Sequence, residues 1–379
     1  MTQPSRRLVI LGATGTVGVQ ALELLKTSPA LEVVALSAHT RQSELIDLAA
    51  PSGGRTFLTD DPQQNQGLLE FLRQGEYHIC LNAVVGAAGL PYSEAVLKAG
   101  KDLALANKES MVLAGELLTK LAEKTGSTIL PVDSEHSAIH QCLRGEQGNA
   151  IRNLYLTASG GALRDLQTDE FANVTPQQAL AHPNWDMGPR ITIDSATMMN
   201  KALEIIEACH LFALPAEQVQ VLVHRQSVVH SMVEFADGSM LAQLGPPDMT
   251  YPIHYALYYP NRPSSNLPGF DAKLFAKLTF EEPDTQRFPA LTLGWRAAKL
   301  GGAAGAVLNA ADEIAVEAFL QQQIRFLDIY ALCANALEQM PDLQANTIAQ
   351  VQAADQWARQ FTSRSIEKQI QAASGVSKS

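Results

Sequence analysis

A short apolar run that passes through three regularly spaced glycines into a helical pattern constrains the fold most. Residues 7–11 (RLVIL) have the composition of a buried parallel strand. GATGTVG follows, and then VQALELLKTS has the period of a helix. In a dinucleotide-binding loop, Gly12 would permit the tight turn, Gly15 the close approach of a pyrophosphate, and Gly18 the packing of the helix. The GxxGxxG spacing is a variant of GxGxxG, and a purely structural glycine turn is the alternative.

The alternation of strands and helices continues beyond this loop. Further apolar runs occupy residues 32–38, 78–84, 102–107 and 127–133, with helical patterns between them. This order predicts an α/β fold with a doubly wound, Rossmann-like parallel sheet, which we assign to a domain over residues 1–133.

The middle of the chain changes character. Strand-like runs with glycine turns are interrupted by one long helix, expected over about residues 196–212, and Asp237-Gly238 predicts a hairpin turn. We therefore expect a central α+β catalytic domain over residues 134–258, with a mostly antiparallel sheet or a sheet backed by helices. Residues 246–269, rich in Pro, Tyr and Ser, have the composition of a connecting segment.

The C-terminal third is rich in alanine and helical in pattern from Leu291 onward. Several helices of this length predict a C-terminal helical bundle, which we assign to residues 286–379 after a linker over residues 259–285.

Composition narrows the class of protein. The chain has 379 residues, of which 46% are hydrophobic and 18% charged, as in a globular protein of two or three domains. A formal net charge of -11 argues against a nucleic-acid partner. No apolar run reaches the length of a membrane span, and no signal-peptide pattern is present, so we expect no membrane partner and a cytoplasmic location. The four scattered cysteines, Cys80, Cys142, Cys209 and Cys333, predict buried, reduced thiols rather than a zinc site.

The end of the second predicted strand bears on the choice of cofactor. NAD-binding folds often place an acidic residue there to hold the ribose 2′-hydroxyl. This chain has Ser37-Ala38-His39-Thr40-Arg41 instead. A cation with small polar neighbours favours a 2′-phosphate and therefore NADP, although Arg41 is equally compatible with a solvated loop arginine.

Three carboxylates in two segments indicate a metal. Asp133 and Glu135 follow an apolar run in PVDSEHSAIHQ, and Glu204 lies in TIDSATMMNKALE. Oxygen ligands suit Mg²⁺ or Mn²⁺. Taken singly, Asp133 and Glu135 are also compatible with a strand end and a helix first turn, where acidic residues are favoured anyway.

The helix that carries Glu204 also carries side chains that suit a phosphate. Asn200, Lys201 and Glu204 are spaced three and four residues apart and should share one face, while Met199, Leu203 and Ile206 should face the core. Ser195 is expected to cap this helix at its N-terminus. The alternative for Lys201 and Glu204 is an ordinary surface ion pair.

A series of motifs in family order makes a resemblance specific. They are GATGTVG, NAVVGAAGL, LANKES, PVDSEHSAIHQ, TASGGALR, HPNWDMG, TIDSATMMNKALE, QSVVHSMVEFADGS and LNAADEIAVEAFL. The chain resembles the 1-deoxy-D-xylulose 5-phosphate reductoisomerase family over nearly its whole length. The resemblance implies NADPH- and divalent-metal-dependent rearrangement and reduction of 1-deoxy-D-xylulose 5-phosphate to 2-C-methyl-D-erythritol 4-phosphate, in non-mevalonate isoprenoid precursor synthesis. It also implies a homodimer.

The resemblance implies a role for each matching residue. The metal, Mg²⁺ or Mn²⁺, would be held by Asp133, Glu135 and Glu204. The substrate would contact Ser134, Glu135, Ser159, His182, Ser195, Asn200, Lys201 and Glu204, with its phosphate at Ser159, Ser195, Asn200 and Lys201. NADPH would contact Gly12, Thr14, Gly15, Thr16, Val17, Arg41, Asn107, Lys108, Glu109 and Gly188. The catalytic set would be Lys108, Ser134, Glu135, His182 and Trp185. Residues 180–190 would form a mobile flap in which Trp185 covers the substrate and Met187 faces the nicotinamide.

Several positions depart from the common family pattern. Ala13 replaces a frequent Ser, AHTR replaces the usual segment after the second strand, and Ala162 and Arg225 each replace a Pro. Asp186 and Pro189 alter the flap, where an additional acidic residue would oppose closure over a phosphate slightly.

The histidines invite other interpretations. His136, His140, His224 and His230 are expected to be mostly structural, because the first two lack the HExxH arrangement of a zinc site. Among the four, we expect His230 as the one to touch the active site.

Two other functions compete with the family assignment. A semialdehyde or acyl-phosphate dehydrogenase would need a nucleophilic cysteine, for which Cys142 is the candidate, although it lies on a predicted helix. A non-enzymatic NADP sensor would have no use for three convergent carboxylates.

Overall fold

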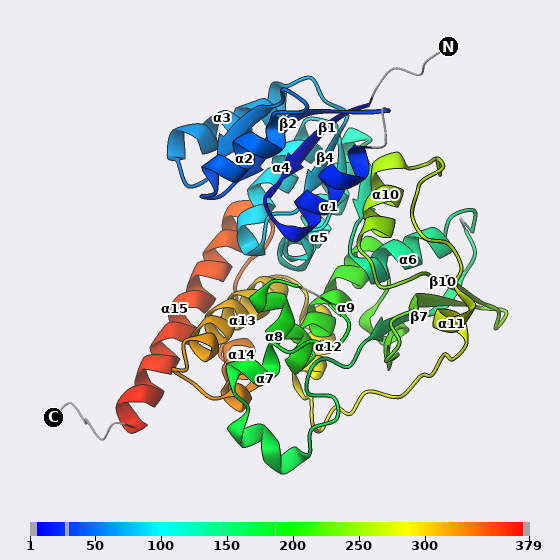
Figure 1. Ribbon diagram of the computed structural model, residues 1–379. Coiled ribbons are helices and arrows are strands. Elements are labelled where there is room, and N and C mark those ends of the chain that lie inside the picture. The colour runs from blue at the N-terminus through cyan, green and yellow to red at the C-terminus, as the bar shows by residue number, and fades with distance from the viewer. Residues whose placement is uncertain (1–5, 27–29, 147, 186, 374–379) are drawn as a thin grey trace. The chain divides into compact units, whose positions relative to one another are not determined.

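The computed structural model describes residues 6–26, 30–146, 148–185 and 187–373 (Figure 1). The described chain forms two compact units. Unit 1 combines the described parts of Met1–Ser110, Leu118–Gly148 and Leu241–Ala276, and unit 2 combines those of Met111–Leu117, Asn149–Met240 and Lys277–Ser379. The expected boundaries at residues 133, 258 and 285 divide the chain by function and stay predictions.

Unit 1 is built on a six-stranded sheet in the order β3-β2-β1-β4-β5-β6, in which all neighbouring strands are parallel. The strands are β1 (Arg6–Leu11), β2 (Leu31–Ala38), β3 (Arg55–Leu58), β4 (Ile79–Asn82), β5 (Asp102–Leu105) and β6 (Ile129–Pro131). The helices that follow them are α1 (Thr16–Leu25), α2 (Gln42–Ala49), α3 (Pro62–Gln74), α4 (Leu90–Lys98), α5 (Lys108–Thr125) and α6 (Ser134–Cys142), with the short η1 (Gly86–Gly89) before α4. The predicted doubly wound sheet is confirmed. The strand order reverses between β1 and β4, which is where such folds bind ligands.

The core of unit 1 explains why its strands lack polar alternation. Leu8, Ile10, Leu36 and Leu81 are fully buried, as expected for a parallel sheet with helices on both faces.

The prediction of a connecting segment over residues 246–269 is wrong in part. Residues Thr250–Tyr258 form helix α10. Ile253, Ala256 and Leu257 are fully buried and belong to the core of unit 1. Their i, i+3, i+4 spacing is helical, but the surrounding Pro and Tyr residues obscured it. The Arg6 side chain donates to the carbonyl of Leu257 at 3.1 Å, which satisfies the end of this helix.

The second sheet has the strand order β10-β9-β7-β8, and its strands β7, β8 and β9 belong to unit 2. The strands are β7 (Ile151–Ala158), β8 (Val219–Val223), β9 (Val229–Phe235) and β10 (Met240–Leu244). β7 pairs parallel with β8 and antiparallel with β9, so the sheet is mixed. The parallel pair arises because helices, not a hairpin, connect β7 to β8. The predicted turn at Asp237-Gly238 is confirmed, since the Phe235 N–H donates to the Ser239 carbonyl at 2.9 Å.

The expected single helix over residues 196–212 is two helices, α8 (Pro189–Thr197) and α9 (Met199–Leu211). Met198 separates them with a φ of 66°. Ser195 therefore lies inside α8 and is not an N-cap. Instead, the Thr197 hydroxyl accepts a hydrogen bond from the Met199 N–H at 3.2 Å, which satisfies a free donor at the start of α9.

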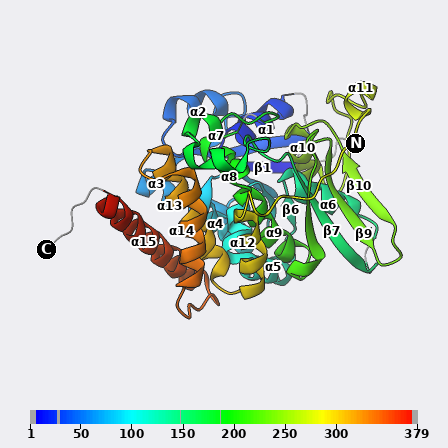
Figure 2. The ribbon, with the colours of Figure 1, turned by 90° about the horizontal axis from the view of Figure 1, so that it is seen from below.

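The predicted C-terminal helical bundle is present and comprises α12 (Ala290–Leu300), α13 (Ala304–Leu320), α14 (Phe326–Glu338) and α15 (Ile348–Ala373). α13 is buried along most of its length, and α14 and α15 both pack beside it (Figures 1 and 2). The shorter elements of the chain are η2 (Thr168–Asn173), α7 (Pro176–Ala179), η3 (Ala216–Gln218) and α11 (Ala272–Phe275). Among the described helices, none combines the length and the apolar character needed to cross a membrane.

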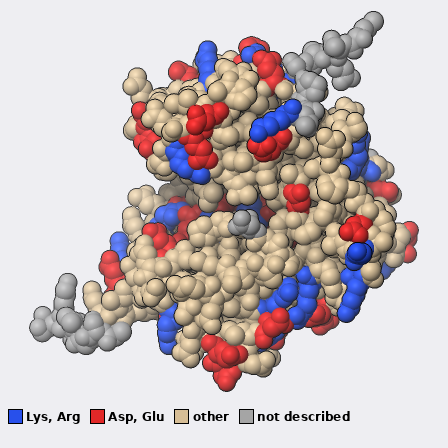
Figure 3. Space-filling view, in the orientation of Figure 1, with Lys and Arg blue, Asp and Glu red and all other residues tan. Residues whose placement is uncertain are grey.

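Charged side chains of both signs are interspersed on the face shown in Figure 3. One ion pair between neighbouring strands joins Arg152 of β7 to Glu234 of β9 at 2.9 Å.

Candidate active site

The glycine loop of unit 1 packs closely against neighbouring backbone. Gly12 has a φ of 76°, and a Cβ there would lie 2.5 Å from the Ala83 carbonyl oxygen. A Cβ on Gly18 would overlap the Gly12 carbonyl, so α1 packs against the loop only because Gly18 lacks a side chain. Gly15 caps α1 without any side-chain hydrogen bond. The N–H groups of the first turn are therefore available to an anion.

Arg41 stands at the start of α2, just beyond the end of β2, as predicted from the sequence. Its side chain is 57% exposed, and its guanidinium lies 3.1 Å from the Glu44 carboxylate. A 2′-phosphate would compete with Glu44 for this cation. The neighbouring His39 ring is paired with the Thr59 hydroxyl at 3.2 Å.

Asn107 and Glu109 tie the start of α5 to the segment after β4. The Asn107 amide donates to the carbonyls of Val84 and Gly86 at 2.8 and 2.9 Å. It also donates to Glu109, whose other carboxylate oxygen accepts from the Gly86 N–H at 3.1 Å. The hydrogen-bonding capacity of the Asn107 side chain is thus largely used within the protein. Its effect on a nicotinamide would come through the backbone that it positions.

Lys108 and Asp133 form a buried ion pair. Their Nζ and Oδ2 atoms are 2.5 Å apart, and the side chains are 8% and 10% exposed. Burial opposes ionisation of Asp133, but the Lys108 ammonium and the His136 ring together hold the pKa of this carboxyl well below its usual range. Asp133 therefore remains an anion in a dry environment.

Ser134 and Glu135 follow at the first turn of α6. The Ser134 hydroxyl donates to the Glu135 carboxylate at 2.6 Å. The start of α6 thus gathers a hydroxyl and two carboxylates, which favour the positive end of a helix dipole.

The polar face of α9 is confirmed and is not a surface feature. Glu204 accepts from the Asn200 amide at 2.6 Å and lies 2.5 Å from the Lys201 ammonium. The side chains of Lys201 and Glu204 are only 5% and 1% exposed. A buried ion pair of this kind is weak support for stability, since desolvation offsets much of its attraction. Met199, Leu203 and Ile206 are buried on the other face, as predicted.

Ser159 and His182 meet in unit 2, although 23 residues separate them. Ser159 follows β7, and its hydroxyl lies 2.9 Å from the His182 Nε2 atom. The His182 Nδ1 atom accepts from the N–H groups of Asn184 and Trp185 at 3.1 and 3.0 Å. Burial lowers the pKa of His182 to about 4. The ring is therefore neutral at pH 7 and carries its proton on Nε2, which donates to Ser159.

The loop after β7 also presses against α8. A Cβ on Gly161 would overlap the Ser195 carbonyl, so this glycine permits Ser159 and Ser195 to lie on adjacent segments of unit 2. Gly188 is the N-cap of α8, and Pro189 stands at the first helical position, where its missing N–H costs nothing. Trp185 and Met187 are partly buried. Asp186, where a weaker closure was expected, lies outside the described residues.

The other singled-out histidines have structural partners. His140 is bonded to the Tyr255 hydroxyl at 2.9 Å, and His224 to the Thr279 carbonyl at 2.8 Å. His136 lies 3.8 Å from Asp133. His230 is buried on β9, and its expected approach to the active site stays a prediction.

The cysteines are mostly as predicted. Cys80, Cys142 and Cys333 are buried free thiols, whereas Cys209 is partly exposed. Cys142 ends α6, and burial raises its pKa to about 11. Such a thiol is a poor nucleophile.

One residue with a clear contact was missed by sequence analysis. The Asn184 amide donates to the Arg225 carbonyl and the Ser227 hydroxyl. These partners are 41 and 43 residues away along the chain, so no local spacing could reveal them.

The predicted residues thus fall into two groups. The first, in unit 1, comprises the glycine loop, Arg41, Asn107, Lys108, Glu109, Asp133, Ser134 and Glu135. The second, in unit 2, comprises Ser159, His182, Trp185, Gly188, Ser195, Asn200, Lys201 and Glu204.

Comparison with known proteins decides the family. The model of the 1-deoxy-D-xylulose 5-phosphate reductoisomerase family matches residues 8–66 and 60–115. Models of the C-terminal domains of the same family match residues 129–212 and 244–361. A 1-deoxy-D-xylulose 5-phosphate reductoisomerase from Xanthomonas oryzae pv. oryzae is 47% identical over 95% of this chain and 97% of its own length. The chain belongs to the 1-deoxy-D-xylulose 5-phosphate reductoisomerase family.

Solved structures of reductoisomerases agree with this assignment. The Zymomonas mobilis enzyme in complex with NADPH matches with a TM-score of 0.89 and 41% identity, covering 96% of this chain and 100% of that one. A reductoisomerase in complex with NADPH, fosmidomycin and magnesium matches with a TM-score of 0.89 and 39% identity, covering 96% and 98%.

Proposed function

We propose that this chain catalyses the reaction of its family, the NADPH- and divalent-metal-dependent conversion of 1-deoxy-D-xylulose 5-phosphate to 2-C-methyl-D-erythritol 4-phosphate. The observation that carries the proposal is the polar face of α9, where Asn200, Lys201 and Glu204 are held together in a buried environment. A carboxylate beside an ammonium and an amide suits a cation next to a phosphate.

The donors present fit the metal. The three residues that the family resemblance implies as ligands, Asp133, Glu135 and Glu204, are all carboxylates, whose oxygen atoms Mg²⁺ prefers, and Mn²⁺ would accept the same set. When bound, the ion would act as a Lewis acid toward the ketone and hydroxyl oxygens of the substrate. Lys108 and Lys201 now neutralise Asp133 and Glu204. A cation on those carboxylates would release both ammonium groups for the substrate.

The substrate phosphate would be bound by the second group of residues. Ser159, Ser195, Asn200 and Lys201 supply donors from two helices and one loop. His182 is neutral and carries its proton on Nε2, so it would offer one further donor without adding charge. Binding energy at the phosphate, remote from the reacting carbons, orients the substrate for rearrangement. Trp185, in the expected flap, would then exclude water.

The glycine loop would bind NADPH through the start of α1. Thr14, Gly15, Thr16 and Val17 lie at this turn. NADPH supplies the hydride that reduces the aldehyde produced by the rearrangement. Arg41 would exchange its contact with Glu44 for the 2′-phosphate.

Three finer assignments belong to the same proposal. A homodimer is supported by β10, an end strand of its sheet that exposes Met240, Leu241 and Leu244. Use of Mn²⁺ beside Mg²⁺ and a cytoplasmic location follow from the family resemblance.

The competing cysteine-dependent dehydrogenase has little structural support, because Cys142 is buried and its pKa is raised. A non-enzymatic NADP sensor would not oxidise NADPH in the presence of substrate and metal, so an activity assay distinguishes it from the proposed enzyme.

The test is whether the reaction requires NADPH, the substrate and a divalent metal together. NADPH oxidation, followed by absorbance at the nicotinamide band, should require both 1-deoxy-D-xylulose 5-phosphate and Mg²⁺ or Mn²⁺. Glu204→Gln should abolish it, while Glu217→Gln, at an exposed acid on η3, should not. Oxidation that proceeds in EDTA, or survives Glu204→Gln, would contradict the proposal.

A further inference from the structure

The Asn184 side chain, in the expected flap over residues 180–190, is bonded to a turn elsewhere in unit 2. The Asn184 amide nitrogen donates one hydrogen to the Arg225 carbonyl at 2.8 Å and the other to the Ser227 hydroxyl at 3.0 Å. Both of its donors are therefore satisfied by a single turn, residues 224–227, which connects β8 to β9.

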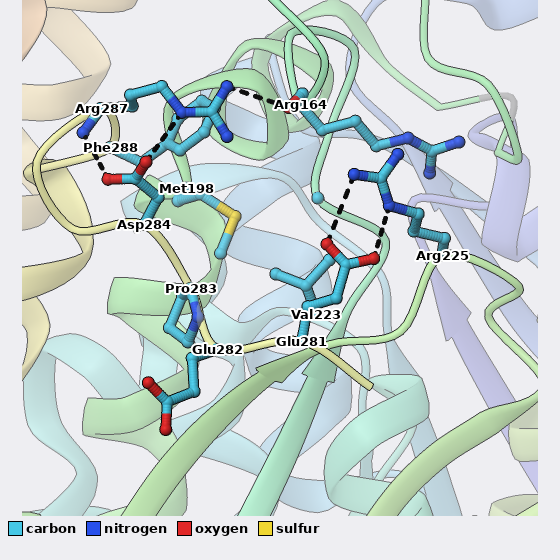
Figure 4. Close-up of a pocket in the computed structure, with 11 residues that line it drawn as sticks. Arg164, Met198, Val223, Arg225, Glu281, Glu282, Pro283, Asp284, Arg287 and Phe288 are labelled. Atoms are coloured by element: carbon cyan, nitrogen blue, oxygen red, sulfur yellow. Dashed lines mark hydrogen bonds and ion pairs between the residues drawn. The ribbon is translucent and has the colours of Figure 1, made fainter. Parts of the chain in front are cut away.

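That turn is itself anchored on several sides. The Arg225 guanidinium bonds to Glu281 at 2.8 Å and to Asp165 at 2.6 Å. Figure 4 shows it directed at the Glu281 carboxylate. The Val223 N–H donates to the Glu281 carbonyl at 2.8 Å, and Gln226 bonds to Thr279. Residues 224–227 are thus held in place by contacts with several other segments of unit 2.

Ser227 holds an unusual backbone conformation that presents its hydroxyl to Asn184. Its φ is 52°, in the left-handed region that residues with a side chain seldom adopt. The Ser227 N–H donates to the His224 carbonyl at 3.0 Å, which closes the turn.

The anchored segment continues directly into the contacts of His182. The N–H groups of Asn184 and Trp185 donate to His182 Nδ1, so they hold the ring with Nε2 toward Ser159. A loss of the Asn184 side-chain contacts would free these two N–H groups. The ring would then be free to rotate away from Ser159 or to exchange its proton between nitrogens.

From this geometry we infer that Asn184 is a positioning residue. By bonding to Arg225 and Ser227 it fixes residues 182–185, and thereby presets His182 and Ser159 as phosphate donors. We call the contacts of the Asn184 side chain with this turn the Asn184 latch. The inference rests on the proposed function for the identity of the phosphate ligand.

The expected effect of losing the latch falls on substrate binding. Without the latch, the arrangement that binds the phosphate becomes only one of several in the free enzyme. The apparent affinity for the substrate then falls in proportion to the fraction of molecules in that arrangement. Two hydrogen bonds of ordinary strength correspond to roughly a ten- to thirtyfold rise in KM for the phosphorylated substrate in Asn184→Ala. Ser227→Ala removes one partner and should raise KM about fivefold. kcat and the KM for NADPH should change less than about twofold, because bound substrate restores the arrangement.

A double-mutant cycle tests the coupling. Asn184→Ala/Ser227→Ala should show the KM of Asn184→Ala alone, because the Ser227 hydroxyl acts only through Asn184. Asn173→Ala, at an exposed asparagine on η2, is the matched control and should behave as the wild type. Additive effects on KM in the double variant, or a fall in kcat without a rise in KM, would overturn the inference.

Hydrogen exchange gives a second measurement that does not depend on activity. In Asn184→Ala, the backbone amides of residues 184 and 185 should exchange at least about tenfold faster than in the wild type, with no change in α13. Unchanged exchange there would overturn the latch even if the substrate is correct. Conversely, a wild-type protein without activity toward 1-deoxy-D-xylulose 5-phosphate would overturn the proposed function. The hydrogen-exchange measurement would still show whether the Asn184 latch holds residues 184 and 185. Ser227→Ala, the milder change, serves the same purpose if Asn184→Ala does not fold.

Discussion

Replacement of Asp312 by Asn should make unit 2 more stable, and increasingly so as the pH rises. Asp312 lies on α13 and is fully buried. Its Oδ2 atom is 3.4 Å from the Arg190 guanidinium, which lies closer to Glu313 at 2.8 Å. Arg190 therefore neutralises the charge of Glu313 more effectively than that of Asp312. Burial outweighs the attraction of Arg190 and raises the pKa of Asp312 from 3.8 to about 6.

The magnitude follows from the linkage between protonation and folding. Each unit of pKa difference between the folded and unfolded chain is worth about 1.4 kcal/mol, so a rise from 3.8 to about 6 corresponds to about 3 kcal/mol. Because the folded pKa is the higher one, the folded state binds the proton more tightly. The ionised Asp312 side chain therefore lowers the free energy of unfolding. This loss of stability is fully present above about pH 6 and disappears as the pH falls toward 3.8. Asparagine carries no charge at any pH and so avoids this cost.

Urea unfolding followed by tryptophan fluorescence is a suitable assay. All three tryptophans, Trp185, Trp295 and Trp357, belong to unit 2, as does Asp312. The free energy of unfolding of Asp312→Asn minus that of the wild type should be near zero at pH 4 and rise to as much as about 3 kcal/mol at pH 8. Asp342→Asn, at an exposed acid of the same unit, should show no such trend. A difference that does not change with pH, or a less stable variant at pH 8, would refute the reasoning.

Three further predictions concern unit 1. Gly12→Ala should weaken NADPH binding at least about tenfold in a fluorescence titration, because its Cβ would meet a backbone carbonyl at 2.5 Å; Gly53→Ala, which has a similar φ of 65° and no neighbour within 4 Å, should not. Arg41→Ser should reduce the preference for NADPH over NADH by about one order of magnitude in kcat/KM, and an unchanged ratio would remove Arg41 from 2′-phosphate recognition. Cys142→Ala should keep kcat within about twofold of the wild type, whereas inactivation in a soluble, folded variant would revive the cysteine-dependent alternative.

Local patterns predicted most of unit 1 correctly because its signals are short in range. Strands that are buried on both faces are recognisable as unbroken apolar runs, and glycines at a strand–helix junction are recognisable by position. α10 was missed because Pro252 and several tyrosines resemble a loop, while the buried face of that helix depends on contacts with distant strands.

The break between α8 and α9 shows a second limit. The sequence predicted one helix over about residues 196–212, whereas the structure has a helix on each side of the left-handed Met198, and the Thr197 hydroxyl bonds to the start of the second. Tertiary packing selects that conformation, since no residue there demands it in isolation.

By itself, the sequence determined the parallel sheet, the glycine loop, the family and the residue types of the candidate site. These follow from local spacing and from motifs, which a linear chain carries directly. Only the tertiary structure decided that Lys201 and Glu204 are buried, that His182 carries its proton on Nε2, and that Asn184 is fixed to a turn some forty residues away. Burial and hydrogen-bond partners depend on which distant segments meet, and the free energy of that meeting is not written in any single stretch of residues.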